Sequence, residues 1–483
     1  MKRAGLRAVE SIACAVLMVS VHAASAAVAQ RSAVNIILKH NRAGWIAEYT
    51  FTKPAPVWFF QHSKDSIDDV HWRLMSFKVA TPGVTLARLG NFDVLYRRNN
   101  RPLRHVRIQI VPFTRPLRAD YVPALTFSDG GVAFYSGQFV VSPLGSRAAV
   151  EVLPSNPDWK KIEDVPERLT VEDRGRRMLL RGRIARDVVT LSLSDPDTYV
   201  YSGDAPLLAA KHFAEVMDPG LPTWVRSQLD TFLPRLMQFY TGRLGVPSGN
   251  KPTALIAWEG TKRPGISLGG SVLDGLVVMD ISGRKMLAAD PKILAGLRWF
   301  LGHETSHFWI GQTIHYSTRE EGWITEGSAD LLGMRAIQNI VPGYDPRPKL
   351  QAEMNDCLKL NGAGKPLSTA EDRGADKAQY ACGALLLLAA EAALKRKDGS
   401  ADALSFVRRL IDANRLDGEI TEAKWLDSFS QVAGPAARDE VQGFIDRGVA
   451  DPLAFWADLF TKTGVGFILQ RDTLTLLDTN DVS

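Results

Sequence analysis

The sequence predicts a multi-domain protein. We expect a β-rich N-terminal domain shaped as a sandwich or saddle, then a region of mixed α and β structure, then a helical C-terminal region. The chain has 483 residues, which is too long for one ordinary domain, and its composition (45% hydrophobic, 23% charged) is typical of a globular protein. Short β-type runs give way to helical periodicity after about residue 203. The expected parts are 30–205, 206–345 and 346–483, after a signal peptide at 1–29.

The first 29 residues have the features of a secretory signal peptide. Basic residues at positions 2, 3 and 7 precede the apolar run IACAVLMVSV, and small residues then allow cleavage after Ala26 or Ala29. The run is short for a bilayer span. We therefore expect an exported protein, periplasmic or secreted, whose mature chain has no membrane span. The alternative is that the segment is retained as an N-terminal anchor.

Charge and cysteine content narrow the possible partners and compartments. The formal net charge is +5, and no basic run of the kind that binds nucleic acid is present, so we expect no nucleic-acid partner. The sequence makes no prediction of the oligomeric state. After signal removal two cysteines remain, Cys357 and Cys382. In an oxidising compartment they form either one disulfide or two buried thiols, because sequence separation does not show whether their Cβ atoms meet.

Turn sequences divide the N-terminal domain into strands. Runs rich in Val, Ile, Phe and Tyr are separated by turn-forming sequences such as TPG, RNNRP and SDGG. The expected strands are 33–40, 45–51, 57–61, 105–113, 132–141, 177–184 and 188–194.

The remainder of the chain is predicted to alternate helices and strands and then to become mostly helical. One helix contains Pro234, which is expected to kink or break it, and another begins with Asp290 as N-cap and Pro291 at the first helical position. The expected helices are 223–245, 291–314, 379–397, 401–414, 421–434 and 451–464, and the expected strands are 252–260 and 269–281, with a β-type tail at 466–478.

The segment HETSHFWIGQTIHYSTREEGWITE, residues 303–326, contains the residue types of a catalytic zinc site. His303 and His307 are four residues apart on an expected helix, so their imidazoles leave one face about a turn apart and can reach one ion. Glu304 lies beside that ion, where a base for an activated water is needed. Glu326, at the start of a second expected helix, provides the third ligand and leaves one position open. The sequence thus predicts one Zn²⁺ per chain.

This segment resembles the gluzincin metallopeptidases, most closely the aminopeptidase N family and its glycyl aminopeptidase relatives. HETSHFWIG is similar to that family's HExxHxWxG, and WITEG is similar to its WxxEG, with the family's eighteen residues between His307 and Glu326. The resemblance is carried by motifs between about residues 265 and 390. It implies a thermolysin-like α+β catalytic domain and a zinc metallopeptidase that acts on a peptide or protein substrate.

The resemblance also assigns roles to two further residues. YACGALLLL, which begins at Tyr380, is similar to the family's Tyr-x-x-Gly-Ala helix start, where the tyrosine hydrogen-bonds the developing oxyanion. Asp330 follows Glu326 at the spacing of the thermolysin branch, where the aspartate orients the first zinc histidine, here His303. The alternative interpretations are an ordinary helix tyrosine and a solvent-facing helix aspartate.

One segment departs from the family. Its edge strand has the pattern Gly-x-Met-Glu-Asn, whose glutamate binds the α-amine of the substrate. The equivalent stretch here is GGSVLDGL, with Gly269 and Gly270 at its start and Val272 in the place of the glutamate. Asp274 is two residues further on, on the same face of a strand, and substitutes if the register slips. A buried ammonium needs a paired charge. We therefore expect a weaker demand for a free N-terminus, which favours an endopeptidase or a blocked substrate more than the family name suggests.

Two other functions stay open at the level of sequence. The first is a zinc hydrolase that acts on a non-peptide substrate, since zinc, a base and an oxyanion donor serve many carbonyl centres. The second is a catalytically retired binding protein on the same fold. Retention of Glu304 and Tyr380 argues against the second, because a structural zinc needs neither of them.

Overall fold

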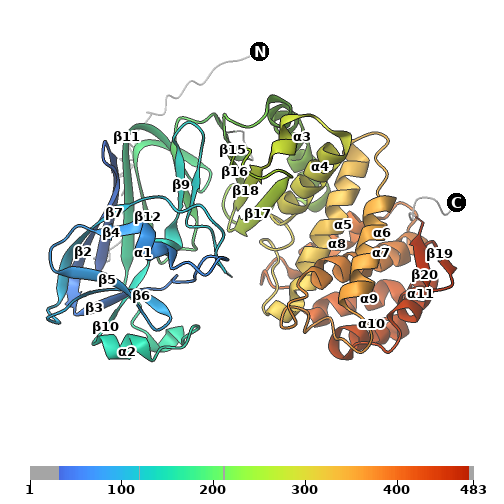
Figure 1. The fold of residues 1–483 in the computed structure, drawn as a ribbon. Helices are drawn as coiled ribbons and strands as arrows, with labels where there is room; N and C mark the ends of the chain where they lie inside the picture. Colours follow the sequence, from blue (N-terminus) through green and yellow to red (C-terminus); the bar gives the residue numbers. More distant parts are fainter. Residues whose placement is uncertain (1–31, 119, 210–212, 478–483) are drawn as a thin grey trace, which may run out of the picture.

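The computed structural model describes residues 32–118, 120–209 and 213–477. The expected signal peptide at 1–29 lies outside these residues. Three parts follow one another along the chain: a β-rich part, a smaller sheet flanked by helices, and a group of packed helices (Figure 1). The predicted fold class is therefore confirmed.

The β-rich part consists of two sheets that share one apolar core. In β1, Val34, Ile36 and Leu38 are buried and alternate with less buried neighbours, which is the period of a strand with one face in the core. The large sheet has the order β4-β7-β2-β1-β11-β13-β9-β8, with β12 also paired to β11, and the small sheet has the order β10-β3-β6-β5. The elements are β1 (Val34–Asn41), β2 (Gly44–Ala55), β3 (Val57–Phe60), α1 (Trp72–Ser76), β4 (Phe77–Val79), β5 (Val84–Leu89), β6 (Phe92–Arg97), β7 (Leu103–Ile110), β8 (Ala124–Thr126), β9 (Val132–Tyr135), β10 (Val141–Leu144), α2 (Arg147–Glu151), β11 (Glu167–Leu180), β12 (Arg183–Ser192) and β13 (Tyr199–Gly203).

Two strand predictions in this part were wrong in their bounds. The segment 177–184 is a hairpin rather than one strand, because Arg181 and Gly182, both with positive φ (48° and 71°), turn the chain between β11 and β12. The segment 132–141 is divided by a 3₁₀ turn at Ser136–Phe139, and its two halves join different sheets.

A five-stranded sheet follows, with the order β14-β15-β16-β18-β17. Its strands are β14 (Leu207–Ala209), β15 (Ala214–Met217), β16 (Thr253–Trp258), β17 (Ser267–Leu273) and β18 (Leu276–Ser282). The segment 269–281 was expected to be one strand and is a hairpin. Asp274 and Gly275 form its two-residue turn, and Gly275 takes the positive φ (67°) that the turn requires. As a result β17 is an edge strand that pairs only with β18 within the described sheet.

Two helices, α3 (Thr223–Leu244) and α4 (Pro291–Ser306), lie beside this sheet (Figure 1), and α5 (Gly322–Ile340) follows them. α3 continues through Pro234, so of the two expected effects of this proline, a kink or a break, the break does not occur. α4 begins as predicted, since Asp290 accepts hydrogen bonds from the Lys292 and Ile293 amides. It ends before His307 instead of at 314, and a run of turns containing Gly311 (φ 128°) leads on to α5.

The C-terminal part is helical, as predicted, and is built around α7, which is buried along most of its length. Two of its helices, α6 and α10, had not been predicted. Its elements are α6 (Arg347–Leu360), α7 (Lys377–Lys397), α8 (Ala403–Asn414), α9 (Glu422–Ala433), α10 (Pro435–Arg447), α11 (Pro452–Thr463), β19 (Phe467–Gln470) and β20 (Thr473–Leu476). Cys357 on α6 and Cys382 on α7 are joined by a disulfide. Across the three described ranges, no helix is both long and apolar enough to cross a bilayer.

Candidate metal and catalytic site

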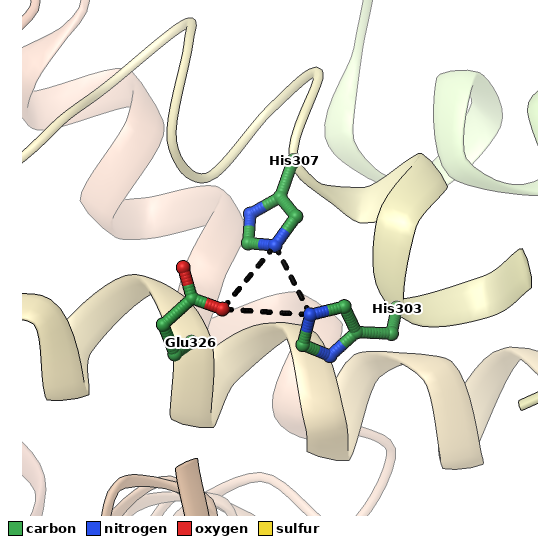
Figure 2. Close-up of side chains that lie close together, drawn as sticks. All are labelled: His303, His307 and Glu326. Carbon is green, nitrogen blue, oxygen red and sulfur yellow. Dashed lines mark hydrogen bonds and ion pairs between the residues drawn. The ribbon is translucent and has the colours of Figure 1, made fainter. Parts of the chain in front are cut away.

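Three ligand atoms converge where α4 ends and α5 begins. His303 Nε2 lies 3.2 Å from His307 Nε2, and Glu326 Oε2 lies 3.5 Å from each of these nitrogens (Figure 2). His303 is in the last turn of α4, His307 is the residue at which that helix ends, and Glu326 lies near the start of α5. The structure therefore brings together the three residues that the sequence predicted as metal ligands.

The second nitrogen of each imidazole has a fixed partner. His303 Nδ1 lies 2.7 Å from Asp330 Oδ1, the pairing expected from the sequence, and His307 Nδ1 lies 3.0 Å from the Ile310 carbonyl oxygen. These acceptors keep a proton on Nδ1, so that each Nε2 turns its lone pair toward the other ligand atoms. Two imidazole nitrogens and a carboxylate oxygen that face one another fit a shared cation, and they are a ligand set of catalytic zinc.

The charges of these groups are strongly coupled. Burial alone would lower the pKa of His303, but hydrogen bonds to Asp330 and Glu326 hold that pKa well above its ordinary value. Burial opposes ionisation of Glu326 as well, but the two imidazoles outweigh it and lower the pKa of this carboxyl. The pKa of His307 is raised, against burial, by the charge of Glu326. Metal ions and protons must therefore compete for the imidazoles.

Glycine contacts determine how closely the three site helices approach. A Cβ on Gly302 would lie 2.8 Å from the Cα of Gly333, so α4 and α5 touch through their backbones beside His303. A Cβ on Gly327 would lie 2.2 Å from the carbonyl carbon of Gly383, so α5 and α7 touch in the same way. These contacts determine the spacing of the side chains that the three helices carry into the site.

Glu304 lies directly beside the edge strand β17. A Cβ on Gly270 would lie 2.1 Å from Glu304 Oε1, so a side chain at this strand position would displace the carboxylate. Burial raises the pKa of Glu304, and the neighbouring His303 and His307 only partly oppose the rise. A carboxylate with a raised pKa is a better proton acceptor than an ordinary one.

Tyr380 lies in the wall of the same site, on α7. Its ring is nearly parallel to that of His303, with centroids 5.8 Å apart and an interplanar angle of 12°. Its hydroxyl donates a hydrogen bond to Glu326. Burial is the larger cause, and the charge of that carboxylate the smaller cause, of the raised pKa of the phenol. The hydroxyl therefore stays protonated at neutral pH and is available as a donor within the site.

A cavity of about 690 Å³ contains these groups and extends to the β-rich part. Tyr121, Tyr135 and Asp197 line it from the β-rich part, and the β17–β18 hairpin lines it from the five-stranded sheet. None of these three residues was predicted from the sequence. They lie on separate segments of the chain, and no local motif marks them, because only the packing of the two parts brings them to the cavity.

Comparison with known proteins establishes the fold. No protein-family model matches the chain, and no curated protein matches it in sequence. Among solved structures, an aminopeptidase N family protein from Idiomarina loihiensis is similar over 90% of this chain and 79% of that chain, with a TM-score of 0.62 and 11% identity. This chain has the aminopeptidase N fold. An M1 zinc metallopeptidase from Deinococcus radiodurans is similar over 87% of this chain and 95% of its own, with a TM-score of 0.46 and 15% identity. Yeast LTA4 hydrolase is similar over 86% of this chain and 66% of its own, with a TM-score of 0.47 and 11% identity.

Within this aminopeptidase N fold, the residues expected to bind substrate on the edge strand fall in different places. Of these residues, Gly270 and Asp274 line the cavity. Val272, which stands in the place of the family's glutamate and was not expected to bind substrate, lines it as well. Gly269 points to the other face of the sheet, where an added Cβ would lie 2.3 Å from Asp280 Oδ1. Asp274 is in the hairpin turn rather than on the strand, and its Oδ2 accepts a hydrogen bond of 2.7 Å from Asn250 Nδ2.

Proposed function

We propose that this chain is an exported zinc-dependent peptidase, periplasmic or secreted. The observation that carries the proposal is the convergence of His303 Nε2, His307 Nε2 and Glu326 Oε2 at 3.2–3.5 Å in a cavity that also contains Glu304. The fold shared with the aminopeptidase N family supports the same assignment. One Zn²⁺ is the proposed cofactor.

The residues of the site have distinct proposed roles. His303, His307 and Glu326 would hold the zinc, and zinc in such a site acts as a Lewis acid that activates water and polarises a carbonyl oxygen. Glu304 takes a proton from the attacking water and passes it to the leaving amine. Tyr380 donates a hydrogen bond to the oxyanion that develops on the scissile carbonyl.

A peptide substrate fits this site better than a small ester or amide. β17 is an edge strand, and Gly270 places its backbone against Glu304. An edge strand can bind an extended peptide through main-chain hydrogen bonds and so align the scissile bond with the base.

Export is proposed from the signal-like N-terminal sequence. The Cys357–Cys382 disulfide supports it, because such bonds persist mainly in oxidising compartments. Fractionation of cells that express the full chain, with N-terminal sequencing of the product, tests this. A cytoplasmic protein that keeps residues 1–29 would refute export.

Metal analysis and peptide-library cleavage test the central proposal. We expect about one zinc per chain by the ligand count, and cleavage that a chelator abolishes. The variant Glu304→Gln keeps the three ligands and should retain zinc while it loses about 10²–10⁴-fold in kcat. Full zinc occupancy in a His303→Ala, His307→Ala double variant would contradict the metal site. Chelator-sensitive hydrolysis of esters without any peptide cleavage would favour a non-peptide hydrolase instead.

A further inference from the structure

Alternate residues of β17 turn their backbone groups outward. Leu273 and Leu276 flank the two-residue turn and form a hydrogen-bonded pair with each other, so the pattern of an antiparallel hairpin leaves Val272 and Gly270 unbonded to β18. The amide and carbonyl groups of these two residues therefore point to the free edge. Gly270 is the one that lies against Glu304.

At Val272 this edge is already occupied. The hydroxyl of Tyr121, which comes from the β-rich part, donates a hydrogen bond of 2.9 Å to the Val272 carbonyl oxygen. Burial raises the pKa of Tyr121 to about 12, so the hydroxyl remains a donor at neutral pH. A peptide paired with β17 cannot use the Val272 carbonyl unless it displaces Tyr121.

The distance from this contact to the reacting centre is short. Gly270 and Val272 are two residues apart, and a strand rises about 3.3 Å per residue, so the Tyr121 contact lies about 7 Å along the edge from the position beside Glu304. This length accommodates about one or two residues of an extended peptide.

The charges in the cavity indicate which end of the substrate lies against Tyr121. Away from the three metal ligands and Glu304, the carboxylates that line the cavity are Asp197 and Asp274. Among the residues that the structure describes, no lysine or arginine lines it. Away from the metal site, a substrate carboxylate would find no lysine or arginine as a partner, whereas an ammonium would find an acid. The blocked end therefore suits the N-terminus of a peptide.

Of the two acids, Asp197 comes from the β-rich part, which with Tyr121, Tyr135 and Asp197 forms one wall of the cavity. Its Oδ2 accepts a hydrogen bond of 2.8 Å from the Tyr135 hydroxyl and lies 3.4 Å from His62 Nε2, and its side chain is still 27% exposed. Asp274 also lines the cavity, but it lies in the hairpin turn, where its Oδ2 accepts a hydrogen bond from Asn250 Nδ2. The β-rich part thus supplies both a steric end and a carboxylate. Protonated His62 lies between Asp197 and Asp120, so these three groups together carry a net negative charge.

We propose that Tyr121 ends the substrate-binding edge of β17 at Val272, and that Asp197 beside it receives the substrate ammonium, so that about one or two residues fit before the scissile bond. This inference rests on the proposed peptidase function. It replaces the weak demand for a free N-terminus expected from Val272, because the missing carboxylate is supplied from another part of the chain.

The test measures the length of the first product from one long peptide of non-repeating sequence with a free N-terminus. Mass spectrometry at low conversion should find only one- or two-residue N-terminal fragments from the zinc-loaded wild-type protein, about the length that the edge allows. Tyr121→Ala removes both the hydroxyl and the ring, and it should raise the rate of release of longer first fragments about tenfold or more, the effect of about 1.4 kcal/mol. Tyr121→Phe should act in the same direction but less strongly.

Tyr49→Phe is the matched control. Tyr49 is a buried tyrosine of the same β-rich part whose hydroxyl also donates to a backbone carbonyl, that of Phe139, but it does not line the cavity. It should leave the product lengths unchanged. Longer first fragments from the wild-type protein would overturn the proposal without any variant, and so would unchanged product lengths in a folded Tyr121→Ala.

Asp197→Asn tests the charge with a peptide and its N-acetylated twin. The wild-type protein should cleave the free peptide faster at the first bond, and Asp197→Asn should raise KM for the free peptide about tenfold while it hardly changes cleavage of the acetylated one. Equal cleavage of the twins by the wild-type protein would refute the role of Asp197. If no peptide is cleaved in a chelator-sensitive way, the peptidase function itself fails, which is a different result from cleavage with the wrong product lengths.

Discussion

The close contact between the edge strand β17 and the proposed base Glu304 depends on Gly270. In Gly270→Ala the new Cβ would lie 2.1 Å from Glu304 Oε1, so the carboxylate must move away from the position where it accepts a proton. We expect kcat to fall about 10²–10⁴-fold, the usual loss of a general base, with zinc still bound. Gly265→Ala is the control, since nothing lies within 4 Å of its added Cβ. Near-normal activity of Gly270→Ala would contradict the contact.

Tyr380 is proposed to contribute to catalysis rather than to substrate binding. Its hydrogen bond is proposed to strengthen only as charge develops on the carbonyl oxygen, so Tyr380→Phe should lower kcat and leave KM nearly unchanged. The expected loss is about 10²–10³-fold. Steady-state kinetics on one peptide measure it. A change in KM alone would remove the oxyanion role and leave Tyr380 as a packing residue.

His303 and His307 make metal affinity depend on pH. Both pKa values are raised, because the carboxylates of Asp330 and Glu326 outweigh burial. A proton on either imidazole must leave before the metal binds, so zinc affinity should rise with pH, and the rise should continue above the ordinary histidine value of about 6.5. Competition titrations with a zinc-binding dye at several pH values measure this. An affinity that is flat above that value would contradict the raised pKa values.

The structure brings together the three predicted ligands, which are close along the chain. The spacing of His303, His307 and Glu326 corresponds to two helix segments, and helical geometry alone indicates that such side chains can meet. It could not indicate that Gly270 lies against Glu304. That contact joins a strand to a helix, and a glycine has no side chain whose chemistry would mark it.

At the scale of elements, the glycine contact between α5 and α7 connects helix packing to the metal site. Gly327→Ala would place a Cβ 2.2 Å from the Gly383 carbonyl carbon, so the two helices must separate. We expect the free energy of unfolding to fall by about 1–3 kcal/mol from overpacking. Because Glu326 precedes this glycine, zinc affinity should fall as well. Denaturant unfolding and zinc titration measure the two effects.

Gly296 on α4 is the control for that substitution, since an added Cβ has nothing within 4 Å. Gly296→Ala should stabilise the protein by up to about 1 kcal/mol through helix propensity and leave zinc affinity unchanged. If Gly327→Ala behaved in the same way as Gly296→Ala, close approach of α5 and α7 would not be needed for the site.

The elements themselves were predicted unevenly, for physical reasons. Long helices with clear caps, such as α4 with Asp290 and Pro291, were found because capping and periodicity are local. The sequence predicts one strand where the β17–β18 hairpin lies, because the turn is only two residues long and apolar residues continue on both sides of it. The sequence predicts that the helix of α4 continues to residue 314, but the structure ends it at Ser306. The turns that follow are held by contacts such as the hydrogen bond from the Gly311 amide to the Ile314 carbonyl, which periodicity does not reveal.

At the scale of the whole molecule, the cavity wall supplied by the β-rich part lay beyond reach of the sequence. Tyr121 and Asp197 are far apart along the chain, and each is unremarkable in its local context. Tyr121 reaches β17, and Asp197 reaches the same cavity, only because the large sheet and the five-stranded sheet pack against each other. Leu179 and Tyr201 of the large sheet lie in one apolar cluster with Val278 of the five-stranded sheet. Interfaces of this kind follow from tertiary packing and leave no periodic signal.

His62, which lies behind this wall, is expected to make the stability of the folded protein depend on pH. Its ring lies between two acids: Nδ1 is 3.1 Å from Asp120 Oδ2, and Nε2 is 3.4 Å from Asp197 Oδ2. Burial alone would lower the pKa of His62, but the hydrogen bonds and charges of the two carboxylates raise it to about 9. The folded protein therefore holds a proton on His62 at a pH where the unfolded chain, with a pKa of about 6.5, has lost it.

The sign of the pH effect follows from this difference. Below about pH 6.5 both states are protonated and the contribution of His62 is fully present, and above that pH it declines as pH rises through about 9, because the folded state then binds the extra proton. We expect the difference in melting temperature between the wild-type protein and His62→Gln to be largest near pH 6 and to shrink toward pH 9.5. The corresponding difference in the free energy of unfolding should change by up to about 3 kcal/mol over this range. His105→Gln is the control, since His105 lies on the exposed side of β7 and pairs only with the Thr50 hydroxyl among the contacts of the described chain. A His62→Gln difference that stays constant or grows over this range would mean that the imidazole is neutral between Asp120 and Asp197, and the wall would then carry two uncompensated carboxylates.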